Sequence, residues 1–129
     1  LMIIRIDTVS TTPIYVQLRN EIVKGIGRGE LSEGECLPTV RQLAADLGVN
    51  SMTVSKAYQT LKAEGFIETD RRRGAIVRSG VQSGAQPDER FREKLEDELE
   101  LLSAEAKIKG LGREEFIHLC SMAFAGMEG

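Results

Sequence analysis

TVRQLAADLGVNSMTVSKAYQTLKAEG, residues 39–65, carries the most informative pattern in this chain. On either side of Gly48, apolar residues recur at the i, i+3, i+4, i+7 spacing of a helix that buries one face. Gly48 can adopt the left-handed conformation that ends the first helix, and Asn50 or Ser51 can cap the second. The pattern predicts a helix-turn-helix, whose second helix enters the major groove of DNA. The apolar positions are Val40, Leu43, Ala44 and Leu47, then Val54, Ala57, Tyr58 and Leu61.

The other side of the second helical segment is polar. Short polar side chains can contact base edges or phosphates there, and a lysine can bind the DNA backbone. Any amphipathic helix also shows polar residues to water, so by itself this side supports the two interpretations about equally. The exposed side of this segment comprises Asn50, Ser51, Met52, Thr53, Ser55, Lys56 and Gln59.

The pattern changes from helical to extended after Gly65. Two β-prone segments, FIETD and AIVRS, enclose RRRG, which predicts a hairpin with Arg71, Arg72 and Arg73 at its tip. Arginines in such a wing can neutralise phosphates or enter the minor groove, and Gly74 permits close approach of the backbone. A solvated charge run is the alternative, which the position directly after a helix-turn-helix disfavours.

The run LPTVRQLAADLGVNSMTVSKAYQTLKAEGFIETDRRRGAIV resembles the winged-helix domain of GntR-family bacterial transcription regulators. The upstream segment PIYVQLRNEIVKGIGRGELSEGECLP fits the first helix of that family, so the resemblance covers residues 12–78. TVSKAY with a short tail is similar to the YtrA-like subfamily. The resemblance implies double-stranded operator DNA as the partner. The contacts that it implies are Thr39, Arg41, Asn50, Ser51, Thr53, Ser55, Lys56, Arg71, Arg72, Arg73 and Gly74.

Two positions depart from the family pattern. Many members carry Arg or Pro where this chain has Ser51, and Ser where it has Thr39. Without an arginine at the start of the second helix a possible bidentate contact to guanine is lost, so base preference does not transfer from relatives. Arg41 matches a family position that commonly meets DNA, and a weak surface salt bridge to Asp46 is its alternative role.

The charge of the chain is unevenly divided. Residues 1–80 contain 11 Lys or Arg and 9 Asp or Glu, giving +2, and residues 81–129 contain 6 and 11, giving −5. The field near a docking face governs attraction to phosphates, so we expect the acidic second half to point away from DNA. Because +2 is modest, we expect affinity to require two copies bound together and to fall steeply with salt.

Length, motifs and cysteine content limit the class of protein. The 129 residues contain no apolar run long enough to span a membrane and no signal-peptide pattern, and Cys36 and Cys120 suit a reducing cytoplasm. His118 and Cys120 would point to different sides of a helix, which makes a poor metal pair. No phosphate-binding loop or nucleophile motif occurs. We therefore expect no enzyme, cofactor, metal or membrane partner, and the alternative function is a protein-interaction module.

The segment before the helix-turn-helix predicts one further helix. Pro13 suits a helix start, and Ile14, Leu18, Ile22 and Ile26 then recur every four residues. After glycines weaken the end of this helix, residues 36–37 are candidates for a short third strand beside the wing.

The second half predicts a helical hairpin. SGVQSGAQPD indicates a flexible linker, and two amphipathic segments follow on either side of GLG at 110–112. Two such helices are too few to form their own core, so we expect them to pair with the same hairpin of a second chain, the alternative being to fold back on the winged helix. They also offer few walls for a ligand, so we expect no dedicated effector pocket. The predicted dimer interface is Phe91, Leu95, Leu99, Leu102, Phe116, Cys120 and Phe124.

Together these patterns predict a mainly α fold with a small β-hairpin. Residues 1–80 form a winged helix-turn-helix DNA-binding domain, 81–88 a linker and 89–129 a helical-hairpin dimerisation domain. The predicted function is a cytoplasmic, sequence-specific transcriptional regulator, a repressor, that binds its operator as a homodimer. The identity of any effector is open.

Overall fold

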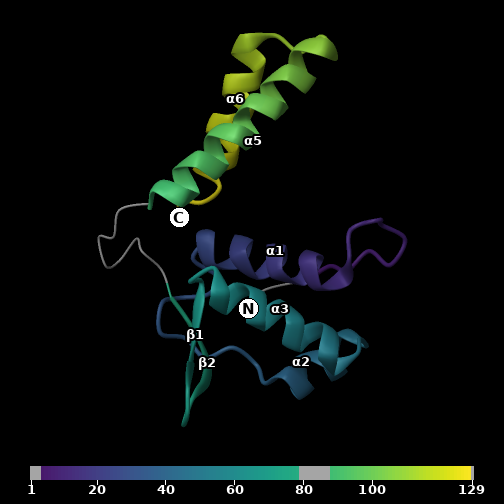
Figure 1. Cartoon of the computed structure of the whole chain (residues 1–129), viewed down its shortest axis with the longest axis vertical. Helices are drawn as coiled ribbons and strands as arrows, with labels where there is room; N and C mark the ends of the chain where they lie inside the picture. The colour runs from purple at the N-terminus through teal and green to yellow at the C-terminus, as the bar shows by residue number, and fades with distance from the viewer. Residues whose placement is uncertain (1–3, 79–87, 129) are drawn as a thin grey trace. The chain divides into compact units, whose positions relative to one another are not determined.

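The computed structural model describes residues 4–78 and 88–128. It contains two units, Leu1–Gln82 and Ser83–Gly129, each of which is described by itself (Figure 1). Of the predicted linker at 81–88, only Asp88 lies among the described residues. The elements of the first unit are α1 (Ile14–Gly27), α2 (Val40–Leu47), α3 (Ser51–Ala63), β1 (Ile67–Asp70) and β2 (Gly74–Val77), and those of the second are α5 (Glu89–Ile108) and α6 (Arg113–Ala125).

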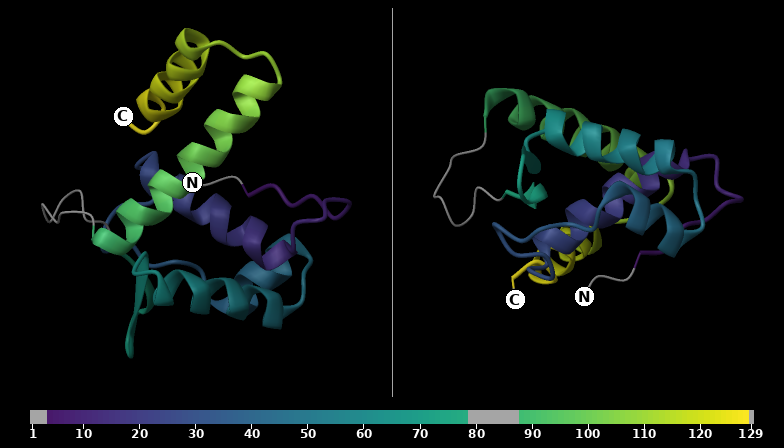
Figure 2. Two further views of the ribbon diagram at one scale, coloured as in Figure 1. Left: turned by 45° about the horizontal axis from the view of Figure 1, so that its top comes forward. Right: turned by 90° about the horizontal axis from the view of Figure 1, so that it is seen from below.

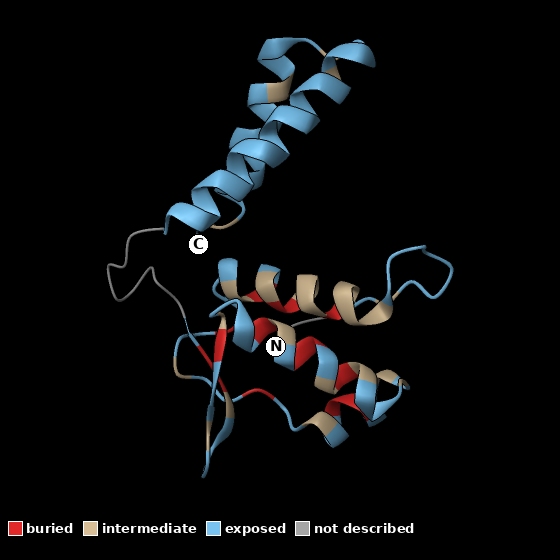
Figure 3. Cartoon of the chain, viewed as in Figure 1, coloured by how far each residue is buried: buried red, intermediate tan, exposed pale blue. Residues whose placement is uncertain are grey.

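Helices α1 and α3 supply the centre of the first unit's core. Leu18 and Ile22 of α1 and Val54, Ala57 and Leu61 of α3 are all 0% exposed. In Figure 3 the buried residues lie on the sides of these two helices that face each other. The four-residue spacing predicted for α1 and the apolar stripe predicted for α3 therefore both meet in one core, as burial of a single helical face requires.

Arg19 fixes α1 to the end of α3. Its Nε donates to Glu64 Oε1 at 2.8 Å and its Nη2 donates to Glu64 Oε2 at 2.9 Å. The guanidinium also lies 5.4 Å from the centroid of the Phe66 ring. Because the pairing is bidentate and the two side chains are only 18% and 35% exposed, it orients α3 more firmly than a fully exposed ion pair would.

The wing is an antiparallel hairpin with a third segment beside it. Strands β1 and β2 pair from Ile67 opposite Val77 to Asp70 opposite Gly74. Cys36 forms a bridge with Ile76, and Leu37 N donates to Ala75 O at 2.9 Å. The expected third strand at residues 36–37 is thus present as a single bridge. The mainly helical fold with a small hairpin that the sequence predicts is confirmed.

The second unit is a pair of helices that lie side by side (Figure 2). Asp88 caps α5 by accepting a hydrogen bond from Phe91 N at 2.7 Å, and Gly110, with φ +89°, permits the turn towards α6. None of the described residues of α5 or α6 is buried. This unit therefore has secondary structure without a core of its own.

Candidate nucleic-acid interface

The corner between α2 and α3 is held by local hydrogen bonds. Thr39 Oγ1 accepts from Gln42 N and Gln42 Oε1 accepts from Thr39 N, both at 3.1 Å, which forms a capping box. Gly48 adopts the left-handed conformation with φ +69°, and Asn50 Oδ1 accepts from Met52 N at 2.7 Å. The predicted glycine stop and the Asn50 cap are confirmed. The angle at which α3 leaves α2 is therefore fixed by the residues of the corner itself.

Helix α3 presents the predicted polar residues on the side opposite its buried stripe. Ser51 and Lys56 are exposed, and Thr53 and Ser55 are partly exposed. Asn50 uses its side-chain oxygen as a cap, which leaves its amide N–H groups available for an acceptor on DNA. Met52 is 76% exposed although it is apolar, and such a side chain can contact a thymine methyl group. These residues form one candidate surface for reading bases.

Lys56 is positioned by an aromatic ring of another helix. Its Nζ lies 4.1 Å from the centroid of the Tyr15 ring in α1. A cation at this distance over a ring is attracted to it, which limits the positions that the ammonium group samples. The ammonium group of Lys56 is thus restrained on the exposed side of α3. The sequence reasoning missed Tyr15, because no local pattern links it to a residue so distant in the chain.

A carboxylate organises the turn of the wing. Asp70 Oδ1 accepts hydrogen bonds from Arg72 N at 2.7 Å and Arg73 N at 3.0 Å. These two backbone bonds lower the pKa of Asp70 below its ordinary value of 3.8. Gly74 then adopts φ +78°, a conformation that glycine enters without strain. The wing turn is therefore ordered by its own residues.

The three wing arginines are not equivalent. Arg73 Nη2 donates to Gly34 O at 2.6 Å, so its guanidinium braces the hairpin against the preceding loop. The side chains of Arg71 and Arg72 are exposed and have no hydrogen bond or ion pair within the described residues. Two free guanidinium groups thus remain at the tip to meet phosphates or a minor groove.

Arg41 lies on the exposed side of α2. No ion pair joins it to Asp46 within the described part of the chain, so the salt bridge considered as its alternative role is not formed. Its guanidinium is therefore available for an external anion. The structure shows where Arg41, Thr39 and the residues of α3 and the wing lie. The DNA contacts implied for them stay predictions.

The second unit gathers most of the predicted interface residues in one place. Leu99, Leu102, Phe116 and Cys120 line a groove of about 760 Å³ between α5 and α6. Phe91, Leu95 and Phe124 lie outside this lining, with 47%, 43% and 68% of their surface exposed. Four of the seven predicted interface residues thus line one groove of this unit.

The described residues also bear on metal binding and on membrane spans. Residues 4–78 and 88–128 contain no group of three His, Cys, Asp or Glu side chains that could hold a metal ion. In the same ranges no helix is both long and apolar enough to cross a membrane.

Comparison with known proteins identifies the family of the first unit. The sequence profile described as bacterial regulatory proteins, gntR family, matches residues 12–77. The HTH-type transcriptional repressor YtrA of Bacillus subtilis (strain 168) is 41% identical over 80 residues, which are 62% of this chain and 62% of that protein. The chain thus spans about three fifths of the length of this curated relative.

Solved structures resemble both units. A transcriptional antiterminator from Listeria monocytogenes EGD-e matches with a TM-score of 0.87 and 28% identity, over 98% of this chain and 93% of its own. YtrA from Sulfolobus acidocaldarius, a GntR-family transcription factor, matches with a TM-score of 0.66 and 41% identity, over 79% of this chain and 98% of its own.

A structure with DNA also matches. The DNA-binding domain of AraR in complex with operator ORX1 has a TM-score of 0.51 and 27% identity, over 56% of this chain and 89% of its own. That domain binds an operator with a fold similar to the first unit.

Proposed function

The chain belongs to the gntR family of bacterial regulatory proteins, and from that membership we propose that it is a transcriptional repressor that binds an operator as a homodimer in the cytoplasm. The observation that carries the proposal is the combination, in one unit, of a capped α2–α3 corner with two wing-tip arginines, Arg71 and Arg72, that have no partner among residues 4–78 and 88–128. The AraR complex supports DNA as the partner, and the name of the Bacillus relative supports repression.

The two parts of the candidate interface have different roles in DNA recognition. The polar side of α3 carries amide, hydroxyl and methionine groups, which discriminate bases in the major groove. Arg71 and Arg72 at the wing supply charge that attracts any DNA and makes affinity depend on salt. Arg73 acts indirectly, because its guanidinium is bound to Gly34 O and keeps the wing in place.

Dimer formation rests on the second unit. Leu99 is 39% exposed and Leu102 52% exposed, and no described residue of α5 or α6 is buried. Pairing this surface with a second copy would cover it and would place two α3 helices on one DNA. Repression follows where the operator overlaps a promoter, because a bound dimer excludes polymerase.

The first test is fluorescence anisotropy of the purified protein against DNA from upstream of its own gene and against a scrambled sequence, over a salt series. Tight binding of the upstream fragment that weakens with salt is expected. Equal, weak binding of both fragments would contradict an operator within that upstream fragment. No binding of either fragment at low salt overturns DNA binding and favours a protein-interaction module.

The same assay tests the separate roles of α3 and the wing. Arg72→Ala should weaken binding to both DNAs and reduce the salt slope by about 1, whereas Thr53→Ala should alter mainly the preference for the operator. Arg73→Ala is the matched variant, since it removes the same charge and also the bond to Gly34. Losses of the same size on both DNAs for Arg72→Ala and Thr53→Ala would contradict the proposed roles.

A further inference from the structure

Among the described residues of the first unit, two cations lie over aromatic rings, and their surroundings differ. Arg19 lies 5.4 Å from the centroid of the Phe66 ring and is also bound by the Glu64 carboxylate. Lys56 Nζ lies 4.1 Å from the centroid of the Tyr15 ring and has no carboxylate partner within the described part of the chain. A carboxylate compensates the charge of a cation, whereas a ring attracts the cation without compensating it. The ammonium group of Lys56 is therefore restrained but remains available to an external anion.

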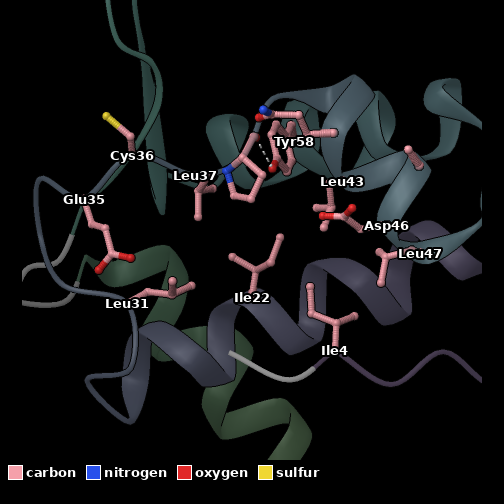
Figure 4. Close-up of a pocket in the computed structure, with 13 residues that line it drawn as sticks. Ile4, Ile22, Leu31, Glu35, Cys36, Leu37, Leu43, Asp46, Leu47 and Tyr58 are labelled. Carbon is pink, nitrogen blue, oxygen red and sulfur yellow. Dashed lines mark hydrogen bonds between the residues drawn. The ribbon is translucent and has the colours of Figure 1, made fainter. Parts of the chain in front are cut away.

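The two tyrosines of the chain also differ in their contacts. Tyr58 is 8% exposed, and its Oη donates to Pro38 O at 2.7 Å within the first unit (Figure 4). Tyr15 is partly exposed, and its hydroxyl group has no hydrogen bond to any residue that the structure describes. The ring of Tyr15 packs against the core on the one hand and contacts the ammonium group of Lys56 on the other. An internal hydrogen bond thus accounts for Tyr58 but not for Tyr15.

Lys56 lies on the exposed side of α3 and is held towards α1. Met52 and Gln59, four residues before it and three after it, are both exposed, so the three side chains share one face. Tyr15 lies near the start of α1, which packs along α3. When a helix lies in the major groove, a phosphate strand runs along each of its flanks. A cation held towards the neighbouring helix would therefore meet a phosphate and not a base edge.

We propose that Tyr15 of α1 is a positioning residue for DNA binding, which holds Lys56 ready to contact a backbone phosphate. A lysine side chain is flexible, and its ordering on binding opposes association. The Tyr15 ring orders the ammonium group before DNA binds, so less ordering remains when the contact forms. This role rests on the proposed function, because it requires DNA as the partner, and it adds α1 to the elements that determine affinity.

The contact itself is measured in the free protein by NMR of the full chain. The ring current of Tyr15 should shift the ε-methylene protons of Lys56 upfield of those of Lys62, an exposed lysine of the same helix. Tyr15→Phe retains a ring and should retain the shift, whereas Tyr15→Leu should remove it. An unshifted Lys56 in the unchanged chain would overturn the inference whether or not the protein binds DNA.

DNA binding is then measured by fluorescence anisotropy with a random-sequence duplex over a series of salt concentrations, since a phosphate contact does not depend on sequence. Tyr15→Leu should weaken binding by about threefold for each bound protomer, and Tyr15→Phe should stay within about twofold of the unchanged chain. Lys56→Met should weaken binding and reduce the salt slope by about 1. Tyr15→Leu should leave the slope unchanged, because the charge of Lys56 remains.

A double variant separates positioning from a general loss of packing. If Tyr15 acts through Lys56, Tyr15→Leu should have no further effect on affinity when Lys56→Met is already present. Ile26→Ala removes a partly buried side chain near the other end of α1 and should leave affinity unchanged. Thermal unfolding checks that every variant is folded at the temperature of the assay.

Three results would overturn the inference while DNA binding stands. They are equal affinity of Tyr15→Leu and the unchanged chain, an equal loss in Tyr15→Phe, and the same loss when Lys56→Met is already present. The second result would assign the contact to the tyrosine hydroxyl group. No binding of the duplex by the unchanged chain at low salt would instead overturn the proposed function, and the role of Tyr15 with it.

Discussion

The two units of this chain differ in how their apolar side chains are covered. In the first unit Leu18, Ile22 and Leu61 are 0% exposed, whereas in the second unit even Leu99, near the middle of α5, is 39% exposed. Both units have regular, capped helices. Capping and helical periodicity therefore do not decide whether a segment is stable alone, because burial supplies most of the free energy of folding. The difference predicts where substitutions have effects and of which kind.

The largest effect is expected in the core of the first unit. Leu61→Ala leaves a cavity and should lower the free energy of unfolding of that unit by about 2–5 kcal/mol. Tyrosine fluorescence in urea measures it selectively, because Tyr15 and Tyr58 are the two tyrosines and the chain has no tryptophan. Leu101→Ala, at a position 62% exposed in α5, is the control and should change this transition little. Equal effects of the two substitutions would remove the distinction between the units.

The next effect is expected on assembly and not on folding of the first unit. Leu99→Asp should raise the dissociation constant of the dimer by at least about thirtyfold, because a charge would be buried in the proposed interface. Sedimentation equilibrium measures this constant, and Leu101→Asp is the matched control outside the predicted interface residues. A dimer that survives Leu99→Asp would place the interface elsewhere.

A smaller effect is expected at a polar group within the first unit. Tyr58 Oη donates to Pro38 O at 2.7 Å, so Tyr58→Phe should cost about 1 kcal/mol at neutral pH. Burial raises the pKa of Tyr58 from 10.0 to about 12, so the stabilisation is complete below pH 10 and is lost as the pH rises towards 12.

Urea unfolding of both proteins over this pH range measures the difference between them. The advantage of the tyrosine protein should shrink as the pH rises and then reverse. A difference that stays constant up to pH 12 would contradict the assigned cause.

The smallest effect is expected at the wing. The pKa of Asp70 is lowered by its bonds to the backbone of Arg72 and Arg73, so the order that it gives the turn is present above the ordinary value of 3.8 and is lost as the pH falls below it. Amide hydrogen exchange at Arg72 and Arg73 should accelerate at acid pH relative to neighbouring amides. Asp70→Asn should remove this acid step, and an unchanged step in that variant would refute the assignment.

Sequence reasoning succeeded where the physical cause is local. The left-handed Gly48, the Asn50 cap and the hairpin at residues 67–77 each depend on residues close in the chain, so short patterns predict them. It failed for partners distant in sequence. The bond from Arg73 to Gly34 and the contact of Lys56 with Tyr15 depend on how the elements pack, which periodicity does not encode.

The hollow at the edge of the first unit's core (Figure 4) was missed for the same reason. Its lining comes from Ile4, α1, α2, α3 and residues 31–38, and no single segment shows a concave surface in its sequence. The candidate DNA contacts illustrate the reverse case. Their residue types and spacing suggested these contacts, which stay predictions, but only the structure separates Arg73, bound to Gly34 O, from Arg71 and Arg72, whose side chains have no partner among residues 4–78 and 88–128.

The exposed apolar residues of α5 and α6 also affect the steady-state abundance expected for this protein in a cell. An unpaired protomer would expose the apolar residues of α5 and α6 to proteases and chaperones, which act on such surfaces. The proposed pairing would protect this surface, and the paired fraction would rise with concentration. At a low rate of synthesis most protomers would stay unpaired and would be degraded quickly. At a higher rate more protomers would pair and persist. The abundance of the protein would therefore respond more steeply than in proportion to its rate of production.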